Sequence, residues 1–137
     1  MAKTSGGIRG KDNTSSAISR KREGYVKAMQ PLLKKSVTRY VGNDKHINIK
    51  FNKRGIEHIA DDMLTKKLGL STKNLSNLDS SLREAIYTKS SGLHKNRKDD
   101  IKRFYYFEDK NKNLRYNVAE QVHKGSVYRF LYSITKK

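Results

Sequence analysis

Three segments in the last third of the chain are rich in aromatic and β-branched residues. They cover residues 101–108, 114–122 and 127–135, and two short polar stretches, 109–113 and 123–125, separate them. This composition is typical of strands, and the polar stretches have the length and residue types of hairpin turns. We expect an antiparallel meander of three strands, against which the helices of the chain must pack.

The residues before this meander alternate between strand and helix patterns. Residues 46–51 alternate apolar and polar side chains and predict a short strand. The apolar residues within 55–67 recur at helical spacing and predict a helix, with Gly69 in a C-cap position after it. A second helix is expected to begin at Ser71 or Thr72 and to end before residues 90–92. The expected fold class is α+β, with helices packed on one face of a small curved antiparallel sheet in the order β-α-α-β-β-β.

The first 44 residues lie outside this predicted core. Residues 1–22 are rich in Gly, Ser and Thr and contain the cluster Arg20-Lys21-Arg22, so a flexible basic arm is expected there. Apolar positions from Tyr25 to Tyr40 recur at helical spacing, which predicts a basic helix over 23–44 that Pro31 starts or kinks. The α+β domain then spans residues 45–137.

The charge of the chain points to an anionic partner. Lys and Arg number 31 against 13 Asp and Glu, a net charge of +18, and a surface with such a field attracts anions. The absence of cysteine excludes disulfides, thiolate zinc sites and cysteine nucleophiles. No apolar run is long enough for a membrane span or a secretory signal, which predicts a protein made in the cytoplasm without a membrane partner.

Several kinds of catalytic site are disfavoured by the motifs. The acidic pairs Asp61-Asp62 and Asp99-Asp100 are neighbours in sequence, whereas a two-metal nuclease collects its carboxylates from different elements. The sequence contains no glycine-rich phosphate loop, nucleophile elbow or zinc deaminase signature. We therefore expect neither a metal nor a cofactor.

Side chains alternate along a strand, so the last strand should present two different faces. We expect its core face to carry Tyr128, Phe130, Tyr132 and Ile134, packed with Phe104 and Tyr106. The opposite, open face then displays groups suited to single-stranded RNA, namely Arg103, Tyr105, Arg115, Asn117, Arg129, Ser133 and Thr135. Guanidinium groups bind phosphate oxygens in a bidentate fork, and a tyrosine stacks on a base. An ordinary solvated sheet face is the alternative interpretation.

Two histidines are further candidates. His58 lies beside the inward-facing Ile59 of the helix predicted over 55–67, where a purely structural role is the alternative. His94 and Lys95 belong to the loop 92–98 between a helix and a strand, a place where functional groups are commonly displayed. We expect this loop to contact phosphate, either within a site or as a mobile basic segment.

The order of these elements resembles the phage-associated barnase, EndoU, colicin and RelE-like (BECR) nuclease domains. The resemblance covers about residues 45–135. It rests on an opening strand that leads into Gly55-Ile56-Glu57-His58-Ile59, a second helix ending near residues 85–87, the segments 103–107 and 115–119, and an aromatic terminal strand closing with Ser133-x-Thr135.

The resemblance implies a small ribonuclease, often encoded by phages and mobile elements or carried as a toxin domain. Such enzymes usually cleave RNA without a metal, through attack of the 2′-hydroxyl on the adjacent phosphate. By analogy, His58 is the candidate base or acid, Arg103 and Arg129 stabilise charge, and Ser133 and Thr135 orient the substrate. His94 or Lys95 would supply the second proton-transfer group.

One departure from the family leaves two functions open. Leu131-Tyr132 precedes Ser133 where toxin relatives often have a histidine. The chain is then either a metal-independent endoribonuclease acting on tRNA or other single-stranded RNA, or a non-catalytic basic protein that binds nucleic acid in a virion or during packaging. A third interpretation concerns context: a toxin, active in the host cytoplasm or delivered to it, that an acidic antitoxin or immunity protein neutralises.

Overall fold

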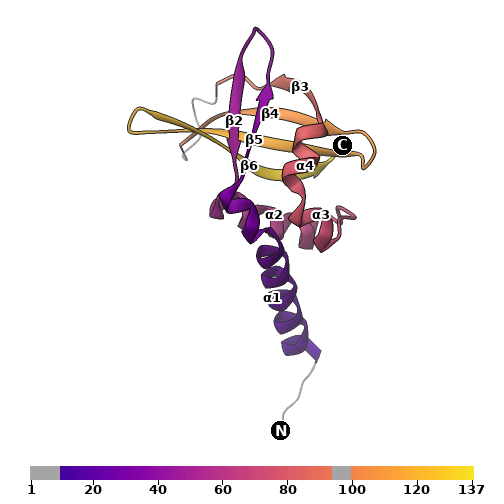
Figure 1. The fold of residues 1–137 in the computed structure, drawn as a ribbon. Coiled ribbons are helices and arrows are strands. Elements are labelled where there is room, and N and C mark those ends of the chain that lie inside the picture. Colours follow the sequence, from indigo (N-terminus) through magenta and orange to yellow (C-terminus); the bar gives the residue numbers. More distant parts are fainter. Residues whose placement is uncertain (1–9, 94–99) are drawn as a thin grey trace.

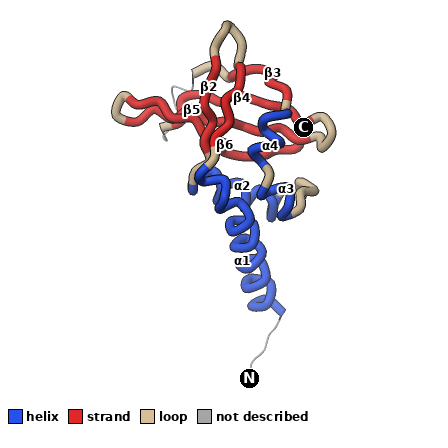
Figure 2. The backbone as a smooth tube through the Cα atoms, in the orientation of Figure 1, coloured by secondary structure: helices blue, strands red, loops and turns tan. Residues whose placement is uncertain are grey.

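The computed structural model describes residues 10–93 and 100–137, with side chains from residue 16 onward. The fold is α+β, as the sequence predicts, with helices on one side of a curled sheet of six strands (Figures 1 and 2). In chain order the elements are α1 (Gly10–Met29), the 3-10 helix η1 (Gln30–Lys34), β1 (Ser36–Tyr40), β2 (His46–Lys50), α2 (Lys53–Thr65), α3 (Thr72–Ser76), α4 (Leu78–Glu84), β3 (Ile86–Ser90), β4 (Ile101–Asp109), β5 (Leu114–His123) and β6 (Ser126–Lys136).

The sheet has the strand order β1-β2-β6-β5-β4-β3. The predicted meander β4–β5–β6 is antiparallel, whereas β2 joins β6 in parallel through the single pair Lys50 and Phe130. The β1–β2 hairpin crosses in front of the meander, so the sheet curls (Figure 1). Apolar side chains from β1, β2 and the meander fill the inside of this curl, and residues of α2, α3 and α4 complete the main core.

The N-terminal segment differs from the prediction. Helix α1 begins at Gly10, so the expected arm is helical from residue 10 onward, and residues 1–9 lie outside the described part of the chain. The C-terminal end of α1 is anchored by the fully buried Met29, and Arg22 forms an ion pair with Asp61 of α2 at 2.7 Å. Its N-terminal end projects away from the body (Figure 1). None of the described helices combines the length and the apolar character that crossing a membrane requires.

The helix expected over 23–44 is wrong beyond residue 34. Pro31 lies in the first turn of η1, and β1 follows from Ser36. Val37 and Val41 are buried, and β1 pairs in antiparallel register with β2. The spacing of these valines fits a strand as well as a helix, and pairing with β2 selects the strand.

The second predicted helix is also shorter than expected. Ser71 begins α3 with a capping box shared with Asn74, a break separates α3 from α4, and the chain then enters β3. Leu82 is buried as predicted, but Ile86 is 48% exposed because it lies on β3, the outer strand beside β4. The apolar repeat that predicted one long helix therefore covers two short helices, α3 and α4, and the start of the outer strand β3.

A bulge in β6 changes the predicted faces of the sheet. Asn117 pairs with Ser133 and Val118 pairs with Leu131, which leaves Tyr132 as the extra residue. Leu131 and Ile134 therefore both belong to the main core. Contrary to the prediction, five rings expected in that core form a separate cluster on the opposite face, around Ile101 and Ala119: Phe104, Tyr106, Tyr128, Phe130 and Tyr132.

Candidate nucleic-acid interface

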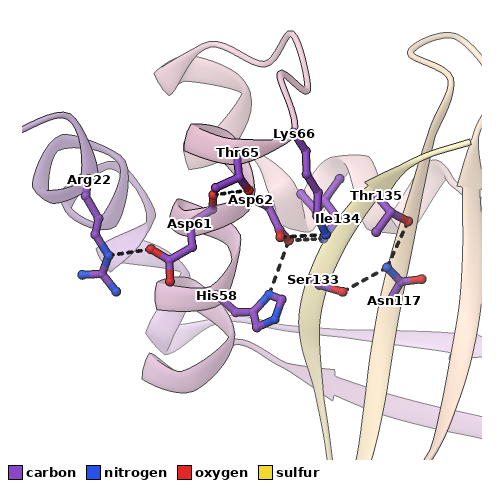
Figure 3. Close-up of polar contacts among 10 residues, drawn as sticks. All are labelled: Arg22, His58, Asp61, Asp62, Thr65, Lys66, Asn117, Ser133, Ile134 and Thr135. Atoms are coloured by element: carbon purple, nitrogen blue, oxygen red, sulfur yellow. Dashed lines mark hydrogen bonds and ion pairs between the residues drawn. The ribbon is translucent and has the colours of Figure 1, made fainter. Parts of the chain in front are cut away.

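The face of the sheet opposite the helices carries a hydrogen-bonded polar cluster. The Asn117 side-chain amide donates to Ser133 Oγ at 3.0 Å and to Thr135 Oγ1 at 3.2 Å (Figure 3). Its Oδ1 accepts a hydrogen bond from Arg115 Nε at 3.0 Å. Both hydroxyls accept from the amide, so the hydrogen of each remains for another acceptor; Ser133 is buried, whereas Thr135 is half-buried. We call Arg115, Asn117, Ser133 and Thr135 the polar cluster.

Aromatic rings border the polar cluster. The Arg115 guanidinium lies 4.4 Å from the centre of the Tyr106 ring. Tyr106 and Phe104 are nearly parallel, with centroids 6.3 Å apart, and Phe104 is 5.6 Å from Tyr132. These rings, with Arg115, Asn117 and Ser133, line an open hollow on the surface. A hollow with ring faces, a guanidinium and hydroxyl donors matches the parts of a nucleotide.

Helix α2 positions His58 at the edge of this face. Asn52 caps the helix by accepting the Gly55 N–H at 2.9 Å. A Cβ on Gly55 would lie 1.9 Å from the Leu131 carbonyl oxygen, so the absence of a side chain lets α2 lie directly against β6. One turn further along the helix, the His58 ring lies 4.3 Å from the Tyr132 ring, and 37% of its side chain is exposed. His58 therefore borders the open face and is accessible to a ligand.

Asp62 lies beneath His58, one helical turn further along α2. Its carboxylate is buried and accepts the Ile134 N–H at 3.0 Å, and Lys66 Nζ is 2.9 Å away (Figure 3). His58 Nδ1 is 3.4 Å from the same carboxylate, although this buried nitrogen lacks hydrogen-bond geometry. Burial raises the pKa of Asp62, but the contacts from His58, Lys66 and the Ile134 N–H outweigh it and lower the pKa below 3.8. The carboxylate is thus ionised beside the imidazole.

Arg54, at the start of α2, extends the cationic border of the face. Its guanidinium lies 5.7 Å from the centre of the Tyr132 ring and 5.9 Å from that of Phe130. It also forms an ion pair with Asp100 at 3.1 Å. A nucleotide whose base stacks beside Tyr132 would therefore find Arg54 and Arg115 on the same surface, where they can contact its phosphate.

Three of the predicted site residues lie on the helix-bearing face of the sheet, whereas the sequence predicted that they share the open face with the polar cluster. Arg103, Tyr105 and Arg129 share the helix-bearing side of the sheet because they align with Val118 and Glu120 in the strand register. There, Arg103 Nε is 3.1 Å from Glu120 Oε2, and Arg129 Nε donates to Oε1 at 3.0 Å. The two arginines therefore do not join His58 in one site.

The structure thus groups five of the ten predicted site residues: His58, Arg115, Asn117, Ser133 and Thr135. His94 and Lys95 lie outside the described residues. Sequence reasoning missed Asp62, although its i+4 spacing from His58 was a usable signal. It also missed Tyr106 and Tyr132, because a one-residue bulge leaves no mark in the sequence pattern. Among the described residues, no three His, Asp or Glu side chains are grouped so as to hold a metal ion.

Comparison of the chain with protein-family models, curated proteins and solved structures returns no match.

Proposed function

We propose that this protein is a metal-independent endoribonuclease that binds single-stranded RNA on the open face of its sheet. The observation that carries the proposal is the position of His58: paired with the ionised Asp62, it borders a surface that holds stacked rings, a guanidinium and two hydroxyl donors. Phage or mobile-element origin and action in a host cytoplasm, with an acidic neutralising partner, belong to the same proposal.

Binding on this face would use two kinds of contact. Bases would stack against the exposed parts of the half-buried Tyr106 and Tyr132 rings, which the Arg115 guanidinium and the His58 ring partly cover, and such stacking contributes about 1–3 kcal/mol per base. Arg115 is held by both Tyr106 and Asn117, so its guanidinium is oriented before a phosphate arrives. Ser133 and Thr135 donate to ribose or phosphate oxygens.

The chemistry follows from the same groups. His58 takes the proton of the 2′-hydroxyl as this oxygen attacks the adjacent phosphorus, and Asp62 stabilises the resulting imidazolium. The new bond joins phosphorus to the 2′-oxygen, the bond to the 5′-oxygen breaks, and the leaving oxygen takes a proton from water. Arg115 stabilises the charge of the pentavalent phosphorane, the role first predicted for Arg103 and Arg129. The products are a 2′,3′-cyclic phosphate and a free 5′-hydroxyl.

A second candidate function is RNA binding without turnover. The observation that favours it is the separation of Arg103 and Arg129 from His58, which leaves the open face without two of the predicted charge stabilisers. The rings and Arg115 would serve binding equally well in this case.

The test is cleavage of end-labelled single-stranded RNA in EDTA. We expect the wild type to produce cyclic-phosphate ends, and His58→Ala to lower the rate 10²- to 10⁴-fold. His123→Ala removes an exposed histidine at the β5–β6 turn and is the matched control, expected to cleave normally. RNA binding by all three proteins without any cleavage would favour the second function, and equal cleavage by His58→Ala would remove His58 from the mechanism.

A further inference from the structure

A second group of charged side chains lies on the helix-bearing face of the sheet. Glu120 on β5 stands directly opposite Arg103 on β4 and Arg129 on β6, and only 7% of Glu120 is exposed. Its Oε1 accepts from Arg129 Nε at 3.0 Å and from the Tyr105 hydroxyl at 2.8 Å, and its Oε2 is 3.1 Å from Arg103 Nε. One buried carboxylate thus holds two guanidinium groups side by side.

The terminal nitrogens of the two arginines are not used in the contacts with Glu120. Both approach Glu120 through Nε, and no hydrogen bond in the described part of the chain uses the Nη groups of either residue. Arg103 Nε is itself buried without a hydrogen bond of good geometry. The exposed fraction of the side chain is 30% for Arg103 and 22% for Arg129. Four Nη groups, each with two donor hydrogens, therefore remain without an acceptor among the described residues.

The positive charge at this place exceeds the negative charge. Lys45, which follows the β1–β2 turn, lies with its Nζ 3.2 Å from the Tyr105 hydroxyl. Lys45, Arg103 and Arg129 give three positive charges against the single carboxylate of Glu120. This leaves a surplus of two positive charges over the Glu120 carboxylate, which a bound dianion would neutralise.

We propose that Arg103, Arg129 and Lys45, held in place by Glu120 and Tyr105, form a second phosphate-binding site, on the face of the sheet opposite the polar cluster. The planar guanidinium forks fit the oxygens of a phosphate group, and Lys45 adds a point charge. The phosphate belongs either to a nucleic-acid chain or to a free nucleotide, and both present the same oxygens. The site does not depend on His58 or on RNA cleavage.

The experiment follows the side-chain Nε–H signals of the arginines in ¹⁵N NMR spectra of the full chain. Inorganic pyrophosphate is titrated at constant ionic strength, with sodium chloride as the reference titration. We expect the signals of Arg103 and Arg129 to shift together and to saturate, with one apparent Kd. Shifts that do not saturate, or that chloride reproduces, would overturn the proposal, and this measurement requires no substitution that could unfold the protein.

Variants then assign the site and its ligand. Arg103→Gln and Arg129→Gln should each weaken pyrophosphate binding at least about tenfold, the loss expected when a charge-assisted contact is removed. Arg83→Gln, at an exposed position on α4, is the matched control and should leave this Kd unchanged; an equal loss in all three variants would mean non-specific charge and would overturn the site. A short thymidine oligonucleotide that produces the same shifts identifies a chain phosphate, whereas shifts with adenosine diphosphate alone identify a free nucleotide.

Discussion

At the scale of single residues, the neighbours Asp61 and Asp62 show how burial separates two identical side chains. Asp61 is exposed and pairs with Arg22, whereas Asp62 is buried and accepts a backbone hydrogen bond from β6. Exposed ion pairs contribute little, and buried carboxylates with several partners contribute much more. The sequence presents the two as an equivalent pair, so only the packing of α2 against β6 distinguishes them.

Asp62→Asn should lower the free energy of unfolding by about 2 kcal/mol at pH 7, because it weakens the contacts with Lys66 and His58. Asp61→Asn is the control, with an expected change within about 0.5 kcal/mol. The folded pKa of Asp62 is lowered, so its contribution is complete above the ordinary value of 3.8 and is lost as the pH falls through the folded pKa. Urea unfolding at pH 7 and below pH 4 measures this, and a difference that grows on acidification would contradict the assignment.

Gly55 is the residue that allows α2 to lie against β6. Gly55→Ala places a Cβ 1.9 Å from a backbone oxygen that cannot rotate away, so we expect a loss of about 1–3 kcal/mol and weaker cleavage, since α2 also carries His58. Gly24→Ala is the control: nothing lies within 4 Å of its Cβ on helix α1, and a gain of about 0.5–1 kcal/mol is expected. Thermal unfolding of both variants compares them, and an unchanged Gly55→Ala protein would mean that the contact relaxes freely.

At the scale of elements, periodicity predicts the strands well and their faces poorly. Residues 101–108, 114–122 and 127–135 are strands within one or two residues of the predicted bounds. The faces are wrong because Tyr132 adds one residue to β6, and a shift of one residue moves every preceding side chain to the other side. Residues 36–40 and 86–90 were predicted as parts of helices but form the strands β1 and β3. Each becomes a strand by pairing with a neighbour in the sheet, and a local sequence pattern does not contain that partner.

The aromatic face gives a prediction at this scale. Tyr106→Leu should weaken binding of single-stranded RNA about 5- to 150-fold, since it removes one stacking surface and the ring that orients Arg115. Tyr40→Leu is the control, because Tyr40 is 49% exposed on β1 and contacts only His46 among the described aromatic rings. Fluorescence anisotropy with a labelled oligonucleotide, under conditions without cleavage, measures both. Equal affinities for the two variants would place the RNA on another surface.

At the scale of the whole molecule, the net charge of +18 predicts an anionic partner but does not say where it binds. Positive side chains occur on α1, on α3, around the open face and around Glu120, so attraction alone would let RNA bind at many places. The open face differs from the other basic regions because it combines cations with ring faces and hydroxyl donors. We therefore expect a diffuse electrostatic contribution from the whole surface and a specific one from this face.

The salt dependence of RNA binding separates these two contributions. The logarithm of the binding constant should fall linearly with the logarithm of salt concentration, with a slope of about 0.7 per phosphate neutralised on a single strand. Arg115→Gln should reduce the magnitude of this slope by about 0.7, because it removes a direct phosphate contact. Lys73→Gln removes the same charge from an exposed position on α3 and should leave the slope nearly unchanged. Equal slopes for the two variants would mean that Arg115 contacts the RNA phosphates no more than Lys73 does. The net charge, rather than the open face, would then hold the RNA.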